Sequence, residues 1–394
     1  MHLWRPSMAL FVAVALPAIA LHAAGEEPVA AGTPEPAASV AEPAGIDPEF
    51  VRPLVPIAGG RNDSNPVWSP ASDMIAFERA RGDDKEIAIV RLNGDVVQTI
   101  HHQSPAAPGQ GRFFFPKVVE PTSYNAGISW SPNGRQFVFM SNAGEGNYDL
   151  YLSEGDGRIT RITTDKEKDG HAHWSPAQDR IAFISGRSGK GDVYLFDLAT
   201  KTTTRLTQGK WPYLYPQWSP DGKRLAVIQG ENENHDVYVL EPGRIPLVPP
   251  KPLTTWSYDD LRPVWSPDGK RLAFYTNYNP ADDPKTWAIA VIAADGSDPT
   301  HGEGLAARVV ATDVIPDIER GPAWMPDNRR IAYVRNERQA FNPIYIADVD
   351  SRTSTLLRTG TKMNHDVACS GSGLLAFRAQ VDQWDQVYVA KLKD

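Results

Sequence analysis

The chain has 394 residues, of which 41% are hydrophobic and 22% are charged, and its formal net charge is −8. This length suffices for one large or two ordinary domains, and the composition is that of a globular protein with a real core. The mildly acidic balance, without a basic run that could neutralise phosphates, argues against a nucleic acid as the partner.

The N-terminus predicts a secretory signal peptide over residues 1–24. Arg5 precedes an apolar stretch at 8–21, and small residues follow it, which is the pattern of a cleaved signal. The stretch is short for a membrane span and contains Pro17, so an uncleaved anchor is the alternative. We therefore expect a periplasmic or secreted protein with no membrane span after cleavage.

Residues 25–48 contain mostly Ala, Pro and Glu, with almost no large apolar side chains. Such a segment cannot bury enough surface to offset its ordering entropy, and it predicts a disordered linker. The chain has a single cysteine, Cys369, so no internal disulfide can form. A bacterial periplasmic protein fits this better than a small secreted eukaryotic domain.

One pattern recurs along residues 49–394, and its clearest copies read "YPQWSPDGKRLAVIQG" from Tyr215 and "RPVWSPDGKRLAFYTN" from Arg262. Six clear copies and one degenerate copy are anchored by Trp68, Trp130, Trp174, Trp218, Trp265, Trp324 and Cys369. The anchors are separated by 62, 44, 44, 47, 59 and 45 residues. A recurring period of ~45 residues is the length of a propeller blade. Cys369 stands where the other copies have tryptophan, so we interpret it as a core thiol and not as a nucleophile.

Each repeat contains four strand-like pieces, which in the third are "HAHW", "RIAFIS", "DVYLFDL" and "TTRLT". Short alternating runs between Gly, Pro and Asp turns indicate antiparallel strands. The sequence predicts an all-β fold, a seven-bladed β-propeller of four-stranded antiparallel blades. The last repeat ends after its third strand, so we expect residues 51–58 to pair with strands near 365–392 and close the ring. Six blades with an irregular end is the alternative.

The stretch "SPDG" at 219–222 has the residues of a hairpin turn, with Pro at i+1 and a glycine that accepts positive φ. Other copies replace Asp221 freely, so we predict a structural turn and not a catalytic carboxylate. Insertions at 101–125, 277–287 and 297–308 fall on loops, which in repeat proteins often form the binding face. The first carries Phe113–Phe115, which pack on their own blade or cover a partner.

The repeated W-S-P-D-G-[KR]-x-[IL]-A-F, followed by D-[VL]-Y-[LV] and R-[LI]-T, resembles the WD40-like repeat of TolB-type propellers over residues 50–394. The resemblance implies a periplasmic role with the Tol–Pal envelope system and a protein partner at the channel mouth. In TolB an α/β domain precedes the propeller, whereas here a low-complexity segment does. Similar propellers in prolyl-oligopeptidase-type peptidases accompany a hydrolase domain, but no G-x-S-x-G elbow occurs in this sequence.

The loops that enter the innermost strands surround the channel mouth of a propeller, and they carry polar residues that the repeat does not require. The binding candidates are Asn65, Asn125, His171, His173, Tyr213, Tyr215, Asp260, Arg262, Arg320, Asn364 and His365. His171 and His173 lie two apart and should face one side of a strand. With His365 and the carboxylates of Asp169, Asp260 and Asp366 they would suit zinc, whereas structural, hydrogen-bonded histidines are the alternative.

The sequence therefore predicts a monomeric, periplasmic protein-interaction or scaffold module of the cell envelope. We assign no catalytic residue, no metal and no cofactor. The alternative is a propeller enzyme, a lyase or hydrolase acting on envelope carbohydrate or peptide with His and Asp residues of the channel.

Overall fold

The computed structural model describes residues 45–57, 59–82, 84–101, 125–144, 147–231, 234–242, 250–278, 286–297, 308–337 and 341–393. The compact unit formed by these residues extends over Gly45–Asp394. The predicted signal peptide, most of the predicted linker, the Phe113–Phe115 loop and most of the other two insertions lie outside the described residues. Within the described part, no helix is long and apolar enough to cross a bilayer.

Over the described ranges, the regular structure consists of strands and one short 3-10 helix at Gly186–Ser188. The first two sheets contain β3 (Asn62–Trp68), β4 (Met74–Arg81), β5 (Asp84–Arg91), β6 (Val96–Ile100), then β7 (Asn125–Trp130), β8 (Phe137–Gly144), β9 (Asn147–Ser153) and β10 (Ile159–Arg161). The next two contain β11 (Asp169–Trp174), β12 (Arg180–Ser185), β13 (Asp192–Asp197), β14 (Thr202–Arg205), then β15 (Tyr213–Trp218), β16 (Leu225–Glu231), β17 (Asn234–Leu240) and β18 (Lys251–Pro252).

The C-terminal half forms one nine-stranded sheet and one further four-stranded sheet. The former contains β19 (Asp260–Trp265), β20 (Arg271–Thr276), β21 (Trp287–Ala293), β22 (Val309–Ile315), β23 (Ala323–Trp324), β24 (Arg330–Arg335), β25 (Ile344–Asp348), β26 (Thr353–Leu357) and β1 (Gly45–Ile46). The latter contains β27 (Asn364–Cys369), β28 (Leu374–Val381), β29 (Trp384–Leu392) and β2 (Pro48–Pro53).

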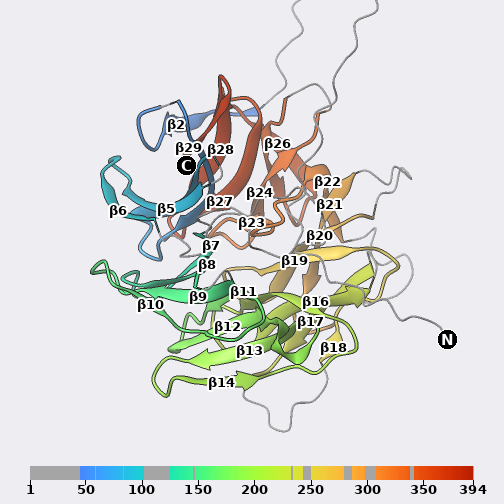
Figure 1. Ribbon diagram of the computed structural model, residues 1–394. Coiled ribbons are helices and arrows are strands. Elements are labelled where there is room, and N and C mark those ends of the chain that lie inside the picture. The colour runs from blue at the N-terminus through green and yellow to red at the C-terminus, as the bar shows by residue number, and fades with distance from the viewer. Residues whose placement is uncertain are drawn as a thin grey trace, which may run out of the picture. The chain divides into compact units, whose positions relative to one another are not determined.

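The four-stranded sheets are propeller blades that follow one another around a centre (Figure 1). Adjacent strands pair antiparallel in chain order, and the first strands of neighbouring blades, such as β11 and β15, contact each other. These first strands are the innermost ones. They carry the residues just before each anchor, so the fold brings those residues together at the centre.

The predicted blade count is wrong. The structure has five four-stranded blades, and neither seven nor six, because the repeats anchored by Trp265 and Trp324 share the nine-stranded sheet. Strand β22 pairs with β21 and also with β24, at Val314↔Arg335 and Ile315↔Val334. Strand β23 is only two residues long, which leaves that end of β24 open to β22.

A turn at Asp317–Gly321 explains why β23 is so short. The backbone N–H groups of Glu319 and Arg320 donate to Asp317 Oδ1 (2.9 and 3.1 Å), and that of Gly321 donates to the Asp317 carbonyl (2.9 Å). These donors would otherwise enter the ladder with β24. The turn itself supplies the acceptors for these three N–H groups. Strand β22 pairs with β24 where a longer β23 would otherwise have paired.

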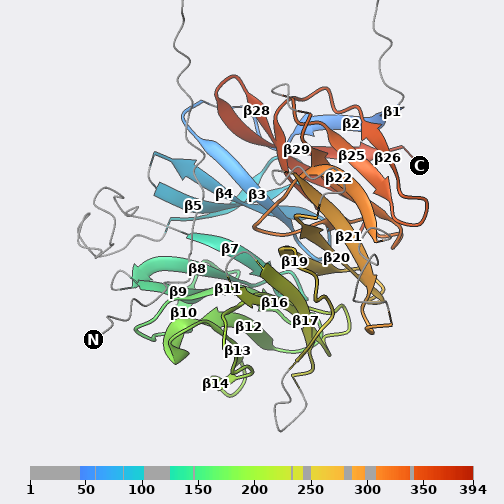
Figure 2. The same cartoon turned by 90° about the vertical axis from the view of Figure 1, so that its right-hand side faces the viewer.

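The N-terminal strand closes the last blade, as the sequence predicts, although β2 spans Pro48–Pro53 and not 51–58. It pairs antiparallel with β29 from Pro48↔Leu392 to Pro53↔Tyr388. In Figure 2 the blue strands β1 and β2 lie against the orange and red strands of the C-terminal part. The pairing covers the outer edge of β29, which would otherwise be open to another chain.

The core lies between neighbouring sheets and is built from equivalent positions of the repeats. Five of the second strands carry a fully buried phenylalanine, and these are Phe77, Phe139, Phe183, Phe274 and Phe377. Five anchor tryptophans donate Nε1–H to a backbone carbonyl of the preceding sheet or repeat, at 3.0–3.4 Å, and these are Trp68, Trp130, Trp218, Trp265 and Trp324. Four of these bonds join two sheets, and that of Trp324 joins two repeats within the nine-stranded sheet.

The "SPDG" stretch forms the predicted turn. The Gly222 N–H donates to the Ser219 carbonyl (2.8 Å), and Gly222 has a φ of +66°. The Ser219 hydroxyl donates to Asp221 Oδ1 (2.6 Å), and this bond lowers the pKa of Asp221. Asp221 is therefore a turn residue. Cys369 packs against the core of the last blade, and burial raises its thiol pKa to about 12, so the sulfur is not a ready nucleophile.

Candidate functional site

Every repeat places a residue with a left-handed backbone three positions before its anchor. We call these seven residues the inner ring: Asn65, Gly127, His171, Tyr215, Arg262, Gly321 and Asp366, with φ between +51° and +92°. In six repeats a β-bulge interrupts the pairing of the innermost strand around this position. A bulge re-aims a side chain locally, and here it does so at equivalent points of successive innermost strands.

Five members of the inner ring are not glycine. A non-glycine residue in the left-handed region costs of order 1–3 kcal/mol, whereas Gly127 and Gly321 adopt it without that strain. No atom lies within 4 Å of a Cβ built at Gly127. At Gly321 a Cβ would lie 2.6 Å from the Arg262 carbonyl oxygen, so only glycine fits there. Gly127 is glycine although a side chain would fit, and the other five repeats carry a side chain at this position.

His171, Tyr215 and Arg262 form a continuous stack from three successive repeats. The His171 ring meets the Tyr215 ring edge-on with centroids 4.7 Å apart, and the Arg262 guanidinium lies 3.5 Å from the centroid of Tyr215. Burial, with Arg262 as the second cause, lowers the pKa of His171 to about 3. The imidazole is neutral at physiological pH, and Arg262, only 6% exposed, is the cation of the stack.

Two carboxylates, Asp366 and Glu78, bond to the inner-ring residues Asn65 and Gly127. Asp366 accepts from the Asn65 backbone N–H (3.3 Å) and forms an ion pair with Arg378 (2.9 Å). Glu78 accepts from Asn65 Nδ2 (3.0 Å) and from the Gly127 N–H (3.2 Å). The Asn65–Asp366 and Gly127–Glu78 bonds join neighbouring blades, and the other two contacts lie within a blade. The ring residues are thus held in place before any ligand arrives.

Four predicted binding residues, Asn125, Tyr213, Asp260 and Asn364, lie five positions before an anchor, and all four are buried. Asn125 Nδ2 donates to the Lys85 carbonyl (3.0 Å), and Asn364 Nδ2 donates to the Asn342 carbonyl (2.8 Å). Burial raises the pKa of Tyr213 to about 12 and that of Asp260 well above its ordinary value. These buried side chains therefore stabilise the innermost strands and do not face a ligand at the surface.

The three predicted channel histidines make separate contacts. The expectation that His171 and His173 face one side is wrong, because the bulge between Gly170 and His173 breaks the period of two. His173 Nδ1 accepts from the Trp218 N–H (3.2 Å), and burial lowers its pKa to about 4. His365 Nε2 lies 3.3 Å from Asn342 Nδ2. Within the described ranges, no three His, Cys, Asp or Glu side chains group as metal ligands.

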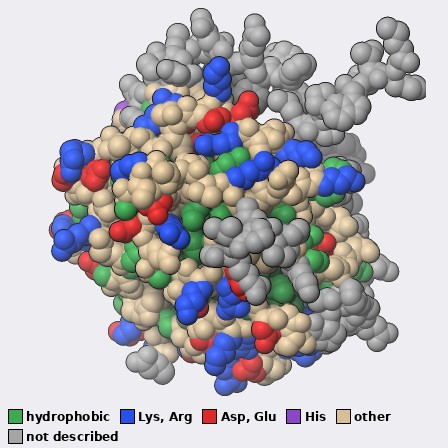
Figure 3. Space-filling view, turned by 90° about the horizontal axis from the view of Figure 1, so that it is seen from below, with side chains coloured by type: hydrophobic (Ala, Val, Ile, Leu, Met, Phe, Trp, Pro, Cys, Tyr) green, Lys and Arg blue, Asp and Glu red, His purple; other side chains and the backbone are tan. Residues whose placement is uncertain are grey.

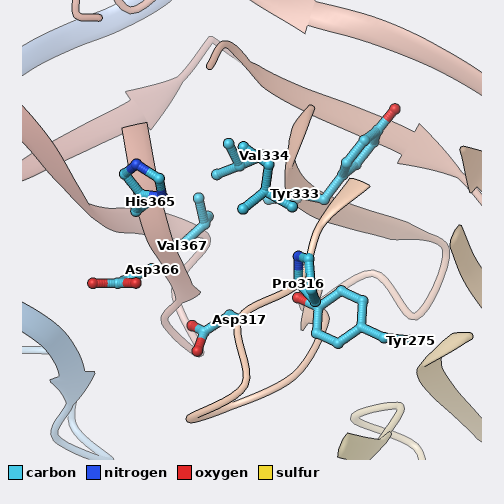
Figure 4. Close-up of a pocket in the computed structure, with 10 residues that line it drawn as sticks. Tyr275, Pro316, Asp317, Tyr333, Val334, His365, Asp366 and Val367 are labelled. Carbon is cyan, nitrogen blue, oxygen red and sulfur yellow. The ribbon is translucent and has the colours of Figure 1, made fainter. Parts of the chain in front are cut away.

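A small pocket of about 20 Å³, enough for about one water molecule, lies between the nine-stranded sheet and β27. Its lining includes Tyr275, Pro316, Asp317, Tyr333, Val334, His365, Asp366 and Val367 (Figure 4). Burial, opposed by Arg320 and reinforced by Asp366, raises the pKa of Asp317 to about 6. Of the predicted residues His365 lines the pocket. Arg320 belongs to the Asp317 turn.

The sequence analysis did not single out the inner ring as a set, nor Asp317, Tyr275 and Glu78. The ring had a signal, because its members stand three residues before the anchor in every copy. No sequence signal pointed to Asp317, since its turn occurs in one repeat alone. On the face seen in Figure 3, positive and negative side chains are intermixed and not gathered by sign.

Comparison with known proteins agrees with the repeat. Residues 116–300 match the family model of the TolB β-propeller domain. A 75-residue segment is 35% identical to the protein TolB homolog of Chlorobium luteolum, and it covers 19% of this chain and 17% of that protein. The chain thus spans a small part of its curated relative. The matched residues therefore have repeats of the TolB type, and the chain is similar to TolB-like β-propellers.

Solved structures show the same fold at low identity. An oligogalacturonate lyase in complex with manganese has a TM-score of 0.62 at 12% identity, covering 89% of this chain and 97% of that one. The β-propeller domain of the Trilobed protease from Pyrococcus furiosus has a TM-score of 0.58 at 12% identity, covering 85% and 99%. These likenesses concern the fold alone.

Proposed function

We propose that this TolB-like propeller is a protein-binding module of the bacterial cell envelope and that the inner ring holds its partner. One observation carries the proposal. Five inner-ring positions keep mostly polar side chains on a left-handed backbone that glycine adopts without strain at the equivalent Gly127. Strain that the fold does not need is typical of sites that serve binding or chemistry.

The chemistry of the ring suits a protein partner. Tyrosine and arginine dominate the binding energy of protein interfaces, and Tyr215 and Arg262 stack on each other in the ring. One exposed apolar residue, Ile318 (40%), borders it, and its carbonyl accepts from Arg262 Nε. A partly apolar surface with fixed polar groups is the usual composition of such an interface.

The envelope location rests on two observations. Residues 1–24 have the pattern of a secretory signal, and the repeats are of the TolB type. Fractionation of cells, with N-terminal sequencing of the recovered protein, tests export and cleavage. Recovery of an intact N-terminus in the cytoplasm would contradict this part of the proposal.

The binding role is tested by affinity capture from envelope extract, with Tyr215→Gly and Lys201→Gly as matched variants. Both residues have a left-handed backbone, with φ of +55° and +57°, but Lys201 lies on an exposed hairpin outside the ring. We expect one protein to be enriched by the wild type and by Lys201→Gly, and to be lost with Tyr215→Gly.

Two results would overturn the binding role. Equal capture by both variants would place the partner elsewhere on the molecule. A protein purified from its host with a stoichiometric metal and no partner would favour an enzyme, the class to which the oligogalacturonate lyase of the same fold belongs. Metal analysis of the purified protein separates these outcomes.

A further inference from the structure

The seam between the blade formed by β15–β18, here called the fourth blade, and strand β19 contains two neighbouring carboxyl groups. Asp236 lies on β17 and is half-buried, and Asp260 is the first residue of β19 and is fully buried. The Thr254 hydroxyl donates to Asp236 Oδ1 (3.3 Å), whereas neither oxygen of Asp260 has a hydrogen-bond partner among the described residues. A buried carboxylate without a partner is costly, so the seam favours the protonated forms.

In two other repeats an arginine bonds to the carboxyl group that is equivalent to Asp236. Arg161 and Arg205 each bond to the aspartate of the neighbouring third strand at 2.6 Å. Both arginines pair in register with a tyrosine of that strand. In the fourth blade Pro252 stands opposite Tyr238 in the same register, so the chain has proline where the arginine would be.

Among the described residues, no lysine or arginine compensates for this loss. The titratable groups that face the two carboxyls are His235, Tyr238 and Asp259. His235 Nδ1 bonds to Asp259 Oδ1 (2.5 Å) and not to the pair, and Asp259 adds negative charge near Asp260. Burial raises the pKa of Asp236 to about 6 and that of Asp260 well above its ordinary value. The two carboxyls are therefore uncharged at acidic pH.

The same seam crosses the inner ring. Tyr215 belongs to β15 and Arg262 to β19, so the stack that they form joins the fourth blade to the nine-stranded sheet. Strand β19 lies against β16 and β17 (Figure 1), and it carries Arg262 two residues after Asp260. Separation of β19 from the fourth blade would therefore expose the carboxyl pair and break the stack.

We propose that this seam is a pH-sensitive joint of the propeller, at which β19 and the fourth blade separate more readily as the pH rises. The inference goes beyond the proposed binding function and does not depend on it. The closed joint retains protons that the open joint releases, so a rise in pH favours the open joint. The stability of the joint is complete below about pH 4, the ordinary carboxyl range, and falls as the pH rises through the Asp236 pKa of about 6.

Hydrogen exchange of the purified protein at pH 5 and pH 7.5, followed by mass spectrometry, tests the joint without any ligand. Dividing the intrinsic exchange rate by the observed rate gives the protection of each strand. We expect the protection of β19 to fall at least about tenfold between the two pH values, because the shift of Asp236 alone accounts for about that factor. At pH 7.5, β19 should be at least about tenfold less protected than β13, where Arg205 bonds to Asp192.

Two changes remove the proposed cause in different ways. The double variant Asp236→Asn, Asp260→Asn removes both carboxyls and keeps His235, and its β19 protection should change less than about threefold between the two pH values. Pro252→Arg keeps both carboxyls and adds a guanidinium at an exposed position, and it should regain at least about threefold of the β19 protection at pH 7.5. Asp156→Asn removes a charge on an exposed hairpin and should behave as the wild type.

Three results would overturn the inference. The first is equal protection of β19 at both pH values. The second is equal protection of β19 and β13 at pH 7.5, which would mean that the propeller opens as a whole. The third is a double variant with the pH dependence of the wild type, which would assign the effect to His235 or to a group outside the seam. If circular dichroism shows that the double variant does not fold, Pro252→Arg decides, and unchanged β19 protection in it would refute the joint.

Discussion

At the scale of single residues, equivalent positions of the repeats hold polar groups with different partners. Five residues before the anchor, Asp63 forms a buried ion pair with Arg79 (2.7 Å) and Asp169 one with Arg187 (2.8 Å). Asp260 occupies the same place without an arginine, and burial raises its pKa well above the ordinary value. Asn125 and Asn364 are neutral there. Six of the seven repeats bury a polar group at this position, the exception being the exposed Glu319.

Asp260→Asn is expected to change how stability depends on pH. The unfolded carboxyl has a pKa near 4, so above that pH the folded protein retains a proton that the unfolded chain has released. The free energy of unfolding of the wild type then falls by about 1.4 kcal/mol per pH unit until the folded pKa is reached. The Asn side chain does not titrate, so the variant lacks this contribution.

Urea unfolding of both proteins at several pH values from 4.5 to 7.5 measures the effect. Groups with shifts of either direction, such as Asp149 and His173, are common to both proteins and cancel in the difference. We expect the variant to gain stability relative to the wild type as the pH rises. A difference that is independent of pH would show that Asp260 titrates normally.

His171→Gly is expected to leave stability nearly unchanged. The substitution removes the edge contact with Tyr215, worth about 0.5–1.5 kcal/mol, but it also relieves a left-handed backbone, worth about 1–3 kcal/mol. Thermal unfolding should show a change within about 1 kcal/mol, while partner capture falls. Lys201→Gly reports the relief of strain alone. A loss of more than about 3 kcal/mol would identify His171 as a structural residue.

At the scale of elements, the anchors join the sheets unequally. Trp218 Nε1 donates to the His173 carbonyl (3.1 Å), whereas Trp174 Nε1 is buried without a hydrogen-bond partner among the described residues. Both side chains are almost fully buried, at 4% and 3% exposure. They fill equivalent spaces, so a comparison between them isolates the hydrogen bond.

Trp218→Phe should therefore destabilise the protein more than Trp174→Phe. Both variants lose similar volume, but the first also strands a buried carbonyl, while the second removes an unpaired donor. We expect a difference of about 1–3 kcal/mol in the free energy of unfolding. Urea denaturation measures it, monitored by far-UV circular dichroism because the substitutions themselves change the tryptophan fluorescence. Equal losses would mean that packing alone accounts for the anchors.

At the scale of the whole molecule, the ring is closed by chain segments far apart in sequence. Strand β2 pairs with β29, and Leu54 and Val55 join a core with Val387 and Val389. The two ends of the compact unit therefore stabilise each other, and the last blade has three of its strands from one end and the fourth from the other.

A chain that begins at Leu54 lacks β1 and β2 and should unfold at a temperature at least about 5 °C lower, with concentration-dependent aggregation through the bare edge of β29. A chain that begins at Gly45 keeps both strands and serves as the control. Differential scanning calorimetry and light scattering measure the two effects. Identical behaviour of the two chains would show that closure contributes nothing.

The sequence by itself determined the local structure. The strands, the "SPDG" turn, the anchors and the pairing of the N-terminal strand with the last repeat follow from side-chain period, turn chemistry and spacing, which act over a few residues or recur in every copy. His171 as a candidate also came from the sequence, although the contacts that it makes did not.

Only the tertiary structure decided how the repeats combine. Two of them share a sheet because the Asp317 turn uses donors that would have formed a strand, and no pattern marks that turn in advance. The bulges that separate His171 from His173, and the neighbours that bury Asp260, likewise depend on contacts between distant segments. The local sequence determines where each strand forms. Strand pairing, burial and charge state depend on residues from distant segments that fold next to it.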